Sequence, residues 1–172
     1  MNHLREVVPE AYDRFIGLLL GDLAVDCCIT KPPCGGEKAG RSPVDRGKQG
    51  IKRSTVVDER GIPLGVVTAP ANRHDSPLLD ETLDHALRTL GELPDRASVH
   101  LDRAYASLTT RRKLEARSLI GEILRKGKSA PVSATKRWIV ERTNSWHNAR
   151  KKLVWCTERR GTVIAFGWPS PR

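Results

Sequence analysis

Residues 22–29 have the sequence DLAVDCCI, a run of small and β-branched apolar residues that contains one internal charge, Asp26. Such a run is typical of a buried strand. A carboxylate inside an apolar strand is costly unless a partner offsets its charge, and a divalent cation is one such partner. We therefore predict a strand over 22–29 that carries Asp26 as a candidate metal ligand.

The segments on either side of this strand differ in kind. Residues 10–20 are predicted to form a short helix. Residues 31–53 contain five glycines, three prolines and seven basic residues with no apolar period, which predicts a long loop without secondary structure. Loops of this length are usually functional or disordered. Because it has so few apolar anchors, we expect this loop to be mobile in the free protein.

The middle of the chain alternates strands and helices. Residues 54–69 (STVVDERGIPLGVVTA) predict a hairpin that turns at Gly61, where a positive φ is inexpensive. Residues 75–90 carry leucines at helical spacing and predict a helix with Asp75 as its N-cap. A strand over 97–102 then ends on Asp102.

The remaining elements complete a recognisable order. They are a helix over about 107–118, a strand over 119–124, a linker over 125–134 and a long helix over about 135–158. This order predicts an α/β fold, a mixed sheet flanked by helices, with a long basic loop after the first strand. Residues 159–172 are expected to be irregular, because Pro169 and Pro171 cannot continue a helix.

The charge of the chain is unevenly distributed. The 172 residues include 30 Lys and Arg against 20 Asp and Glu, a formal charge of +10. Residues 31–53 hold net +5 and residues 136–160 net +6, whereas 54–135 is nearly balanced. Two basic blocks favour a polyanionic partner, although solvated basic faces would give the same pattern. No apolar run approaches the roughly 18 residues of a membrane span, so we expect no membrane partner and a cytoplasmic location.

The four cysteines do not form a framework. Cys27, Cys28, Cys34 and Cys156 contain no C-x-x-C pair. We therefore expect reduced, structural thiols and no zinc site.

Three carboxylates stand out by their positions. Asp26 lies within a strand, Asp102 ends one, and Glu141 lies in the first turns of the long helix. Two strand carboxylates and one from a covering helix can hold two magnesium ions roughly 3.5–4 Å apart, which would activate a nucleophile and stabilise a leaving phosphodiester oxygen. Spacing alone also allows surface or capping roles for all three.

Glu141 belongs to a polar stripe of the long helix. Residues three and four apart share a helix face, so Arg137, Glu141, Ser145, Asn148 and Lys152 line up. The stripe could face a scissile phosphate. It could equally be a solvated face with an Arg137–Glu141 ion pair worth a few tenths of a kcal/mol.

Four blocks of the sequence resemble the DDE transposases of a large group of bacterial insertion sequences. They are VDCCITKPPCGGEKAGRSPVDRGKQGIKRS (25–54), DERGIPLGVVTAPANRHDS (58–76), HLDRAYAS (100–107) and RWIVERTNSWHNARKKLVW (137–155). The resemblance covers about residues 20–158 in the family's order. It implies a ribonuclease-H-like fold with one acid on the first strand, one on the fourth and a glutamate on a late helix. The resemblance implies that the catalytic residues are Asp26, Asp102 and Glu141. It also implies that these residues hold two Mg²⁺ ions, which Mn²⁺ can replace.

The resemblance also implies DNA contacts. Arg137 matches a family arginine that contacts DNA near the cut. The wider family has a tyrosine and a lysine where this chain has Ala134 and Asn148, so nearby cations are expected to replace the lysine. With the two basic blocks, the candidate DNA-binding residues are Lys31, Lys38, Arg41, Arg46, Lys48, Lys52, Arg137, Arg142, Asn148, Arg150, Lys151 and Lys152.

The implied activity is metal-dependent strand cleavage and strand transfer at the ends of an insertion sequence. The partners are double-stranded DNA, both inverted-repeat ends and target, and a second copy of the chain. We expect a nucleoid-associated bacterial protein, and a truncated copy: residues 1–20 as the remnant of an N-terminal helical region, 21–158 as the catalytic domain and 159–172 as a frameshifted tail. The alternative is a non-catalytic DNA-binding remnant that interferes with intact transposase. A generic nuclease of this fold is disfavoured by the loop at 31–53.

Two further features leave alternatives open. His74 matches a family block and could carry protons at the metal site, but a structural role is favoured for a histidine in a loop before a helix. Trp138, Trp146 and Trp155 could stack on flipped bases, whereas their helical spacing favours packing in the core.

Overall fold

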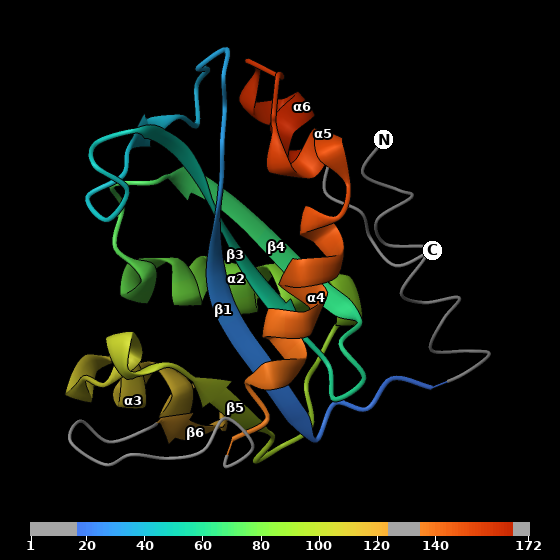
Figure 1. Cartoon of the computed structure of the whole chain (residues 1–172). Coiled ribbons are helices and arrows are strands. Elements are labelled where there is room, and N and C mark those ends of the chain that lie inside the picture. Colours follow the sequence, from blue (N-terminus) through green and yellow to red (C-terminus); the bar gives the residue numbers. More distant parts are fainter. Residues whose placement is uncertain (1–16, 124–134, 167–172) are drawn as a thin grey trace.

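The computed structural model describes residues 17–123 and 135–166. In this part of the chain six strands form one sheet, with helices on both faces (Figure 1). The strands are β1 (Asp22–Thr30), β2 (Gly40–Arg41), β3 (Gln49–Val57), β4 (Pro63–Pro70), β5 (Ser98–Leu101) and β6 (Ile120–Ile123). The helices are α2 (Asp75–Leu90), η1 (Arg103–Tyr105, 3-10), α3 (Leu108–Glu115), α4 (Trp138–Asn148), α5 (Lys151–Val154) and α6 (Gly161–Phe166).

The sheet is antiparallel on one side and parallel on the other. β1, β3 and β4 form an antiparallel meander, in which Asp26 pairs with Thr55. β5 and β6 pair in parallel beside β1, because α2 and α3 carry the chain back before each of these strands. The order is β4, β3, β1, β5, β6, and β2 pairs with the first residues of β3. The predicted mixed α/β fold is confirmed. No helix in the described ranges is long and apolar enough to cross a membrane.

β1 divides its side chains between the two faces of the sheet, because successive strand residues point to opposite sides. Leu23 and Val25 are fully buried in the main core, with leucines of α2. Ala24 packs instead with Ile139 and Val140 of α4 in a smaller cluster. Figure 1 shows α2 and α4 on opposite sides of the sheet. Asp26, two residues beyond Ala24, therefore faces α4.

α4 runs along β1 in the same direction. Lys136, just before the helix, contacts Asp22 at the start of β1, and Asn148 at the end of the helix contacts Cys28 near the end of β1. Twelve helical residues rise about 18 Å and six strand residues about 20 Å, so the two segments match in length.

The predicted loop over 31–53 is shorter in the structure than expected. Its last five residues belong to β3, and residues 40–41 form β2. Residues 51–53 pair with β1 on one side and β4 on the other. Lys31, at the other end, forms a bridge with Trp155. The prediction of a loop without secondary structure was therefore wrong for residues 40–41 and 49–53. Residues outside the predicted loop, in β1 and β4, pair with the end of this segment and form the sheet with it.

The predicted helix over 135–158 is broken after Asn148. Arg150 has an extended backbone, with φ −91° and ψ 116°. The chain then turns so that the N–H of Lys31 donates to the carbonyl of Val154 at 3.0 Å and the N–H of Cys156 donates to the carbonyl of Lys31 at 2.9 Å. Contacts with the end of β1 therefore override the local helical pattern.

The tail also departs from expectation. Residues 161–166 form α6, where an irregular segment was predicted. Ile164 packs with Ile51 and Cys156 in a third cluster, and the N–H of Gly161 donates to Glu37 Oε2 at 2.7 Å. Pro169 and Pro171 lie outside the described residues.

Three smaller predictions concern element ends. The helix expected over 10–20 lies mostly outside the described residues, and residues 17–20 are not helical. The linker expected over 125–134 also lies outside them. The N-cap of α2 is His74 rather than Asp75, and Asp75 instead accepts a hydrogen bond from Lys52.

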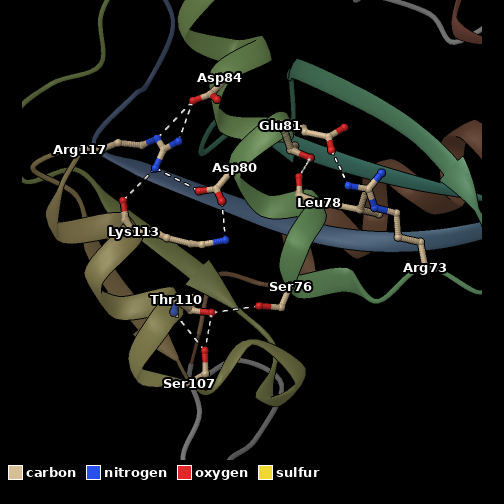
Figure 2. A network of polar contacts seen from close by, with 11 residues as sticks. Arg73, Ser76, Leu78, Asp80, Glu81, Asp84, Ser107, Thr110, Lys113 and Arg117 are labelled. Atoms are coloured by element: carbon tan, nitrogen blue, oxygen red, sulfur yellow. Dashed lines mark hydrogen bonds and ion pairs between the residues drawn. The ribbon is translucent and has the colours of Figure 1, made fainter.

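A network of ion pairs fastens α3 to α2 on the side of the sheet away from α4 (Figure 2). Asp80 pairs with Lys113 and Arg117, and Arg117 also pairs with Asp84 at 2.8 Å. Figure 2 shows Ser76 of α2 facing Thr110 of α3, 3.3 Å apart between their hydroxyl oxygens. These contacts hold the connection that follows β5.

Candidate active site

Two acids lie at the same level on neighbouring parallel strands. Ala24 of β1 pairs with His100 of β5. Continuing this register by two residues places Asp26 opposite Asp102, the residue directly after β5. Asp102 caps η1, because its Oδ1 atom accepts the N–H of Arg103 at 2.6 Å. The sequence prediction that one acid lies within a strand and the other ends one agrees with this placement.

Three polar contacts fix α4 over the strands. The ammonium of Lys136 donates to Asp22 Oδ2 at 2.8 Å and to Glu59 Oε1 at 2.6 Å. Further along the helix, the buried hydroxyl of Thr143 donates to the carbonyl of Gly61 at 2.8 Å. The first turns of α4 are therefore tied to β1 and to the turn between β3 and β4.

Arg137 joins the second and third acids. Its Nη1 atom lies 3.3 Å from Asp102 Oδ1, and its Nη2 atom lies 3.0 Å from Glu141 Oε1. The arginine side chain is 18% exposed, whereas those of the two acids are 41% and 45% exposed. A single cation thus lies between a carboxylate from the end of β5 and one from α4.

The first acid lies beside this pair. Burial raises the pKa of Asp26 to about 6. The N–H of Cys27 and the positive charge of Arg137 act to lower that pKa, and the negative charges of Glu141 and Asp102 act to raise it. The carboxyl of Asp26 therefore shares one electrostatic site with the other two acids.

The donor set suits a hard divalent cation, since three carboxylates supply only oxygen ligands. Burial is the main cause of the raised pKa of the half-buried Asp26, and a bound cation would lower this pKa. Across the described residues, however, no three acidic, histidine or cysteine side chains are grouped closely enough to hold a metal. Arg137 bridges Asp102 and Glu141 instead, so the predicted direct convergence on shared ions is not formed in this conformation.

Most of the predicted DNA-binding cations lie on the surface. Lys38 is half-buried, and Lys31 lies over the ring of Trp155, 5.8 Å from its centroid. The exposed cations of the predicted set are Lys31, Arg41, Arg46, Lys48, Arg150, Lys151 and Lys152.

Lys52, Asn148 and Arg142, which also belong to that set, make contacts within the protein. Lys52 is buried and donates to the carbonyl of Arg73 at 2.6 Å and to Asp75. Asn148 donates to the sulfur of Cys28 at 3.4 Å. Arg142 stacks against two tryptophan rings. Lys52 therefore fixes the start of α2. The sequence prediction missed this role because it assigned Lys52 to a loop.

Sequence reasoning missed a polar layer between α4 and β3. Arg53 is fully buried, and its Nη2 atom donates to Asn148 Oδ1 at 3.2 Å and to Asn144 Oδ1 at 3.4 Å. Burial, followed by the positive charges of Arg53 and Arg150, lowers the pKa of the neighbouring His147 to about 4. A strand assignment over 49–53 would have placed Arg53 on the face of Thr55, toward α4.

The tryptophans and His74 are exposed. Trp138, Trp146 and Trp155 are 42%, 58% and 55% exposed, so the prediction that they pack in the core was wrong. His74 lies exposed at the N-cap of α2 without a capping side-chain hydrogen bond.

Structural similarity supports the fold. A chain in the cryo-EM structure of the simian T-cell lymphotropic virus intasome with PP2A regulatory subunit B56 gamma matches with a TM-score of 0.51 at 18% identity. The match covers 77% of this chain and 40% of that one. The structure of the Mos1 transposase catalytic domain with raltegravir and Mg matches with a TM-score of 0.44 at 12% identity, covering 95% and 87% of the two chains. The first match, with its TM-score above 0.5, and the observed mixed sheet confirm the predicted ribonuclease-H-like fold.

Sequence similarity gives the family. The protein assigned as transposase for insertion sequence element IS402 of Burkholderia cepacia is 32% identical over 134 residues, which are 75% of this chain. The chain spans 64% of the length of that relative. Residues 29–161 match the family model described as the transposase DDE domain, and this range contains both Asp102 and Glu141. The chain belongs to the DDE transposase family.

Proposed function

We propose that this chain cuts and joins DNA strands at a site formed by Asp26, Asp102 and Glu141. The observation that supports it best is the single guanidinium of Arg137 between Asp102 and Glu141, beside the half-buried Asp26. Arg137 links the acids at the end of β5 and on α4, and its charge also acts on Asp26 of β1, which supports a common site for three residues that are distant in sequence.

Asp26, Asp102 and Glu141 are the residues that would hold Mg²⁺ or Mn²⁺. When bound, two such ions activate a water or a 3′-hydroxyl and stabilise the leaving oxygen of a phosphodiester. In this proposal Arg137 leaves the acids and contacts a DNA phosphate near the cut. Lys136 keeps the start of α4 in place through Asp22 and Glu59 while this exchange occurs.

Two groups of exposed cations would bind double-stranded DNA. One lies between β1 and β3 and includes Arg41 of β2 and the loop residues Arg46 and Lys48. The other follows α4, at 150–152. Each cation near a phosphate releases condensed counterions, so binding would weaken steeply with salt. The proposed substrates are the inverted-repeat ends of an insertion sequence and its target, bound in the bacterial cytoplasm by an assembly of more than one copy.

A non-catalytic DNA-binding remnant is the second candidate. It is favoured by the absence, among the described residues, of a three-residue group placed to hold a metal. In that case Arg137 would be a permanent structural bridge.

Nicking of supercoiled plasmid DNA distinguishes the two candidates. The purified chain is incubated with Mg²⁺, Mn²⁺, Ca²⁺ or EDTA, and open-circular product is quantified. We expect nicking with Mg²⁺ or Mn²⁺, none with Ca²⁺, and none for Asp102→Asn. Asp95→Asn, an exposed aspartate before β5, serves as the matched control and should nick like the unmodified chain. Equal activity of the Asp102→Asn and unmodified chains would overturn the proposed site.

A further inference from the structure

α4 carries an exposed ladder of two aromatic rings with a cation between them. The α4 ladder consists of Trp138, Arg142 and Trp146, which follow one another every four residues on one face of the helix. The guanidinium carbon of Arg142 lies 4.8 Å from the ring centroid of Trp138 and 4.9 Å from that of Trp146. One guanidinium therefore stacks with both rings.

The ladder is held in place but does not contribute to the core. The Nη2 atom of Arg142 donates to the carbonyl of Arg60 at 2.7 Å, which fixes the guanidinium. Trp138 and Trp146 lie outside the apolar clusters of the described residues and are about half exposed. Arg142 orients both rings, and much of each ring surface remains open to solvent.

The ladder lies on a different flank of α4 from the proposed active site. Trp138 and Arg142 directly follow Arg137 and Glu141, and successive helix residues point about 100° apart. Arg142 contacts Arg60 in the β3–β4 turn, whereas Arg137 contacts Asp102 at the end of β5. Eight residues separate the two rings, about 12 Å along the helix axis. A strand bound at the acids would therefore have to cross the exposed side of α4 to reach the rings.

We propose that the α4 ladder is a stacking platform for unpaired nucleotides of the DNA that this chain acts on, an inference that rests on the proposed function. Aromatic rings beside cations bind single strands by stacking on bases without regard to sequence. Bases in a duplex are already stacked on their neighbours, so an open ring face favours an unpaired base. Arg142 adds positive charge that suits a phosphodiester backbone.

The charge around the ladder argues against a second copy of the chain as its occupant. Residues 136–160 carry net +6. A twofold contact would place this same surface against itself, which would bring two basic blocks together. Nucleic acid has the opposite charge.

Binding of labelled oligothymidylate and of a labelled duplex, measured by fluorescence anisotropy in EDTA, tests the platform. Trp138→Ala and Trp146→Ala should each weaken single-strand binding on the order of tenfold, and should change duplex binding less than about twofold. Trp138→Phe and Trp146→Phe retain an aromatic face and should keep most of the affinity. Leu108→Ala removes an exposed apolar side chain on α3, away from the ladder, and should leave single-strand affinity unchanged.

The platform would be overturned if the two Trp→Ala variants lost equal affinity for single-stranded and duplex DNA, or lost no affinity for single strands. A shift from dimer to monomer for Trp146→Ala in sedimentation would also overturn it, because the ladder would then be a protein interface. EDTA removes cleavage from the measurement. A chain that never nicks plasmid but keeps the ladder effect overturns only the proposed chemistry, whereas a nicking chain without the ladder effect overturns only the platform.

Discussion

Arg137 and Glu141 lie one turn apart on α4, with Nη2 of the arginine 3.0 Å from Oε1 of the glutamate. On its own this would be an ordinary ion pair along a helix, worth a few tenths of a kcal/mol. The second bond of Arg137, to Asp102, makes the same guanidinium the link between α4 and the end of β5.

Replacing Arg137 with Ala should destabilise the metal-free chain by about 1 kcal/mol, because partly exposed pairs contribute roughly 0.2–1 kcal/mol each. Mn²⁺ should stabilise the variant more than the unmodified chain, since no cation then competes for the carboxylates. Thermal unfolding with EDTA and with Mn²⁺ measures both effects. Arg111→Ala on the exposed face of α3 is the control. An identical difference in Tm in EDTA and in Mn²⁺ would contradict this account.

Lys136 should act as a positioning residue. Lys136→Met removes the bonds to Asp22 and Glu59 and should reduce plasmid nicking severalfold, while unfolding changes by no more than about 1 kcal/mol, because the side chain is 39% exposed. Lys136→Arg should restore part of the activity. A loss of activity that merely follows a loss of folded protein, judged by circular dichroism, would make the role structural.

Gly61→Ala should loosen the contact between α4 and the β3–β4 turn. Gly61 has φ +89°, and a Cβ there would lie 2.8 Å from the hydroxyl oxygen of Thr143. Gly47→Ala is a matched control, because Gly47 has φ +71° and nothing within 4 Å. Both variants incur the cost of a positive φ, about 1–2 kcal/mol, and only Gly61→Ala adds the clash. Urea unfolding should therefore show a larger loss for Gly61→Ala, and equal losses would refute the contact.

His147 should make the fold sensitive to mild acid. Its pKa is lowered to about 4, so the folded state favours the neutral ring. The free energy of unfolding is therefore highest above the unfolded pKa of about 6.5, where the ring is neutral in both states. It decreases as the pH falls toward 4, on the order of 3 kcal/mol in all. Urea unfolding across this range compares the unmodified chain with His147→Gln. The variant should lose less stability, and parallel curves would exclude His147 as the cause.

The loop after β1 should set the salt dependence of duplex binding. Replacing Arg41, Arg46 and Lys48 with Gln should flatten the plot of log K against log salt by about 0.9 for each phosphate that the loop no longer neutralises. The matched set Arg88, Arg111 and Arg112, also exposed but on α2 and α3, should leave the slope unchanged. Equal slopes for the two triple variants would mean that the loop does not bind the duplex.

The local sequence pattern was sufficient to predict those elements whose own residues determine their structure. The apolar run around Asp26 predicted β1, and the leucines of α2 predicted that helix at its observed bounds, 75–90. The local pattern failed where contacts with residues distant in the sequence determine the structure. Lys52 and Arg53 look like loop cations, yet Asp75 and Asn144 allow them to lie buried in β3.

The site shows the same division. Asp26, Asp102 and Glu141 could be chosen by position and by resemblance, but the bridging of two of them by Arg137 depends on β5 and α4 meeting in space. The exposure of Trp138 and Trp146 was missed because helical spacing fits a buried row as well as an open one.

The alternation along β1 makes this strand intolerant of a change in length. Leu23 and Val25 face the main core, while Ala24 and Asp26 face α4. Deleting one residue between Gly21 and Ala24 would turn the following side chains of β1 to the opposite faces of the sheet, if the chain before the deletion keeps its place. A carboxylate would then lie among the leucines of α2, and a valine would lie beside Arg137. A variant of this gene that loses a single codon there should accumulate as insoluble protein, even though all three proposed catalytic residues are still encoded.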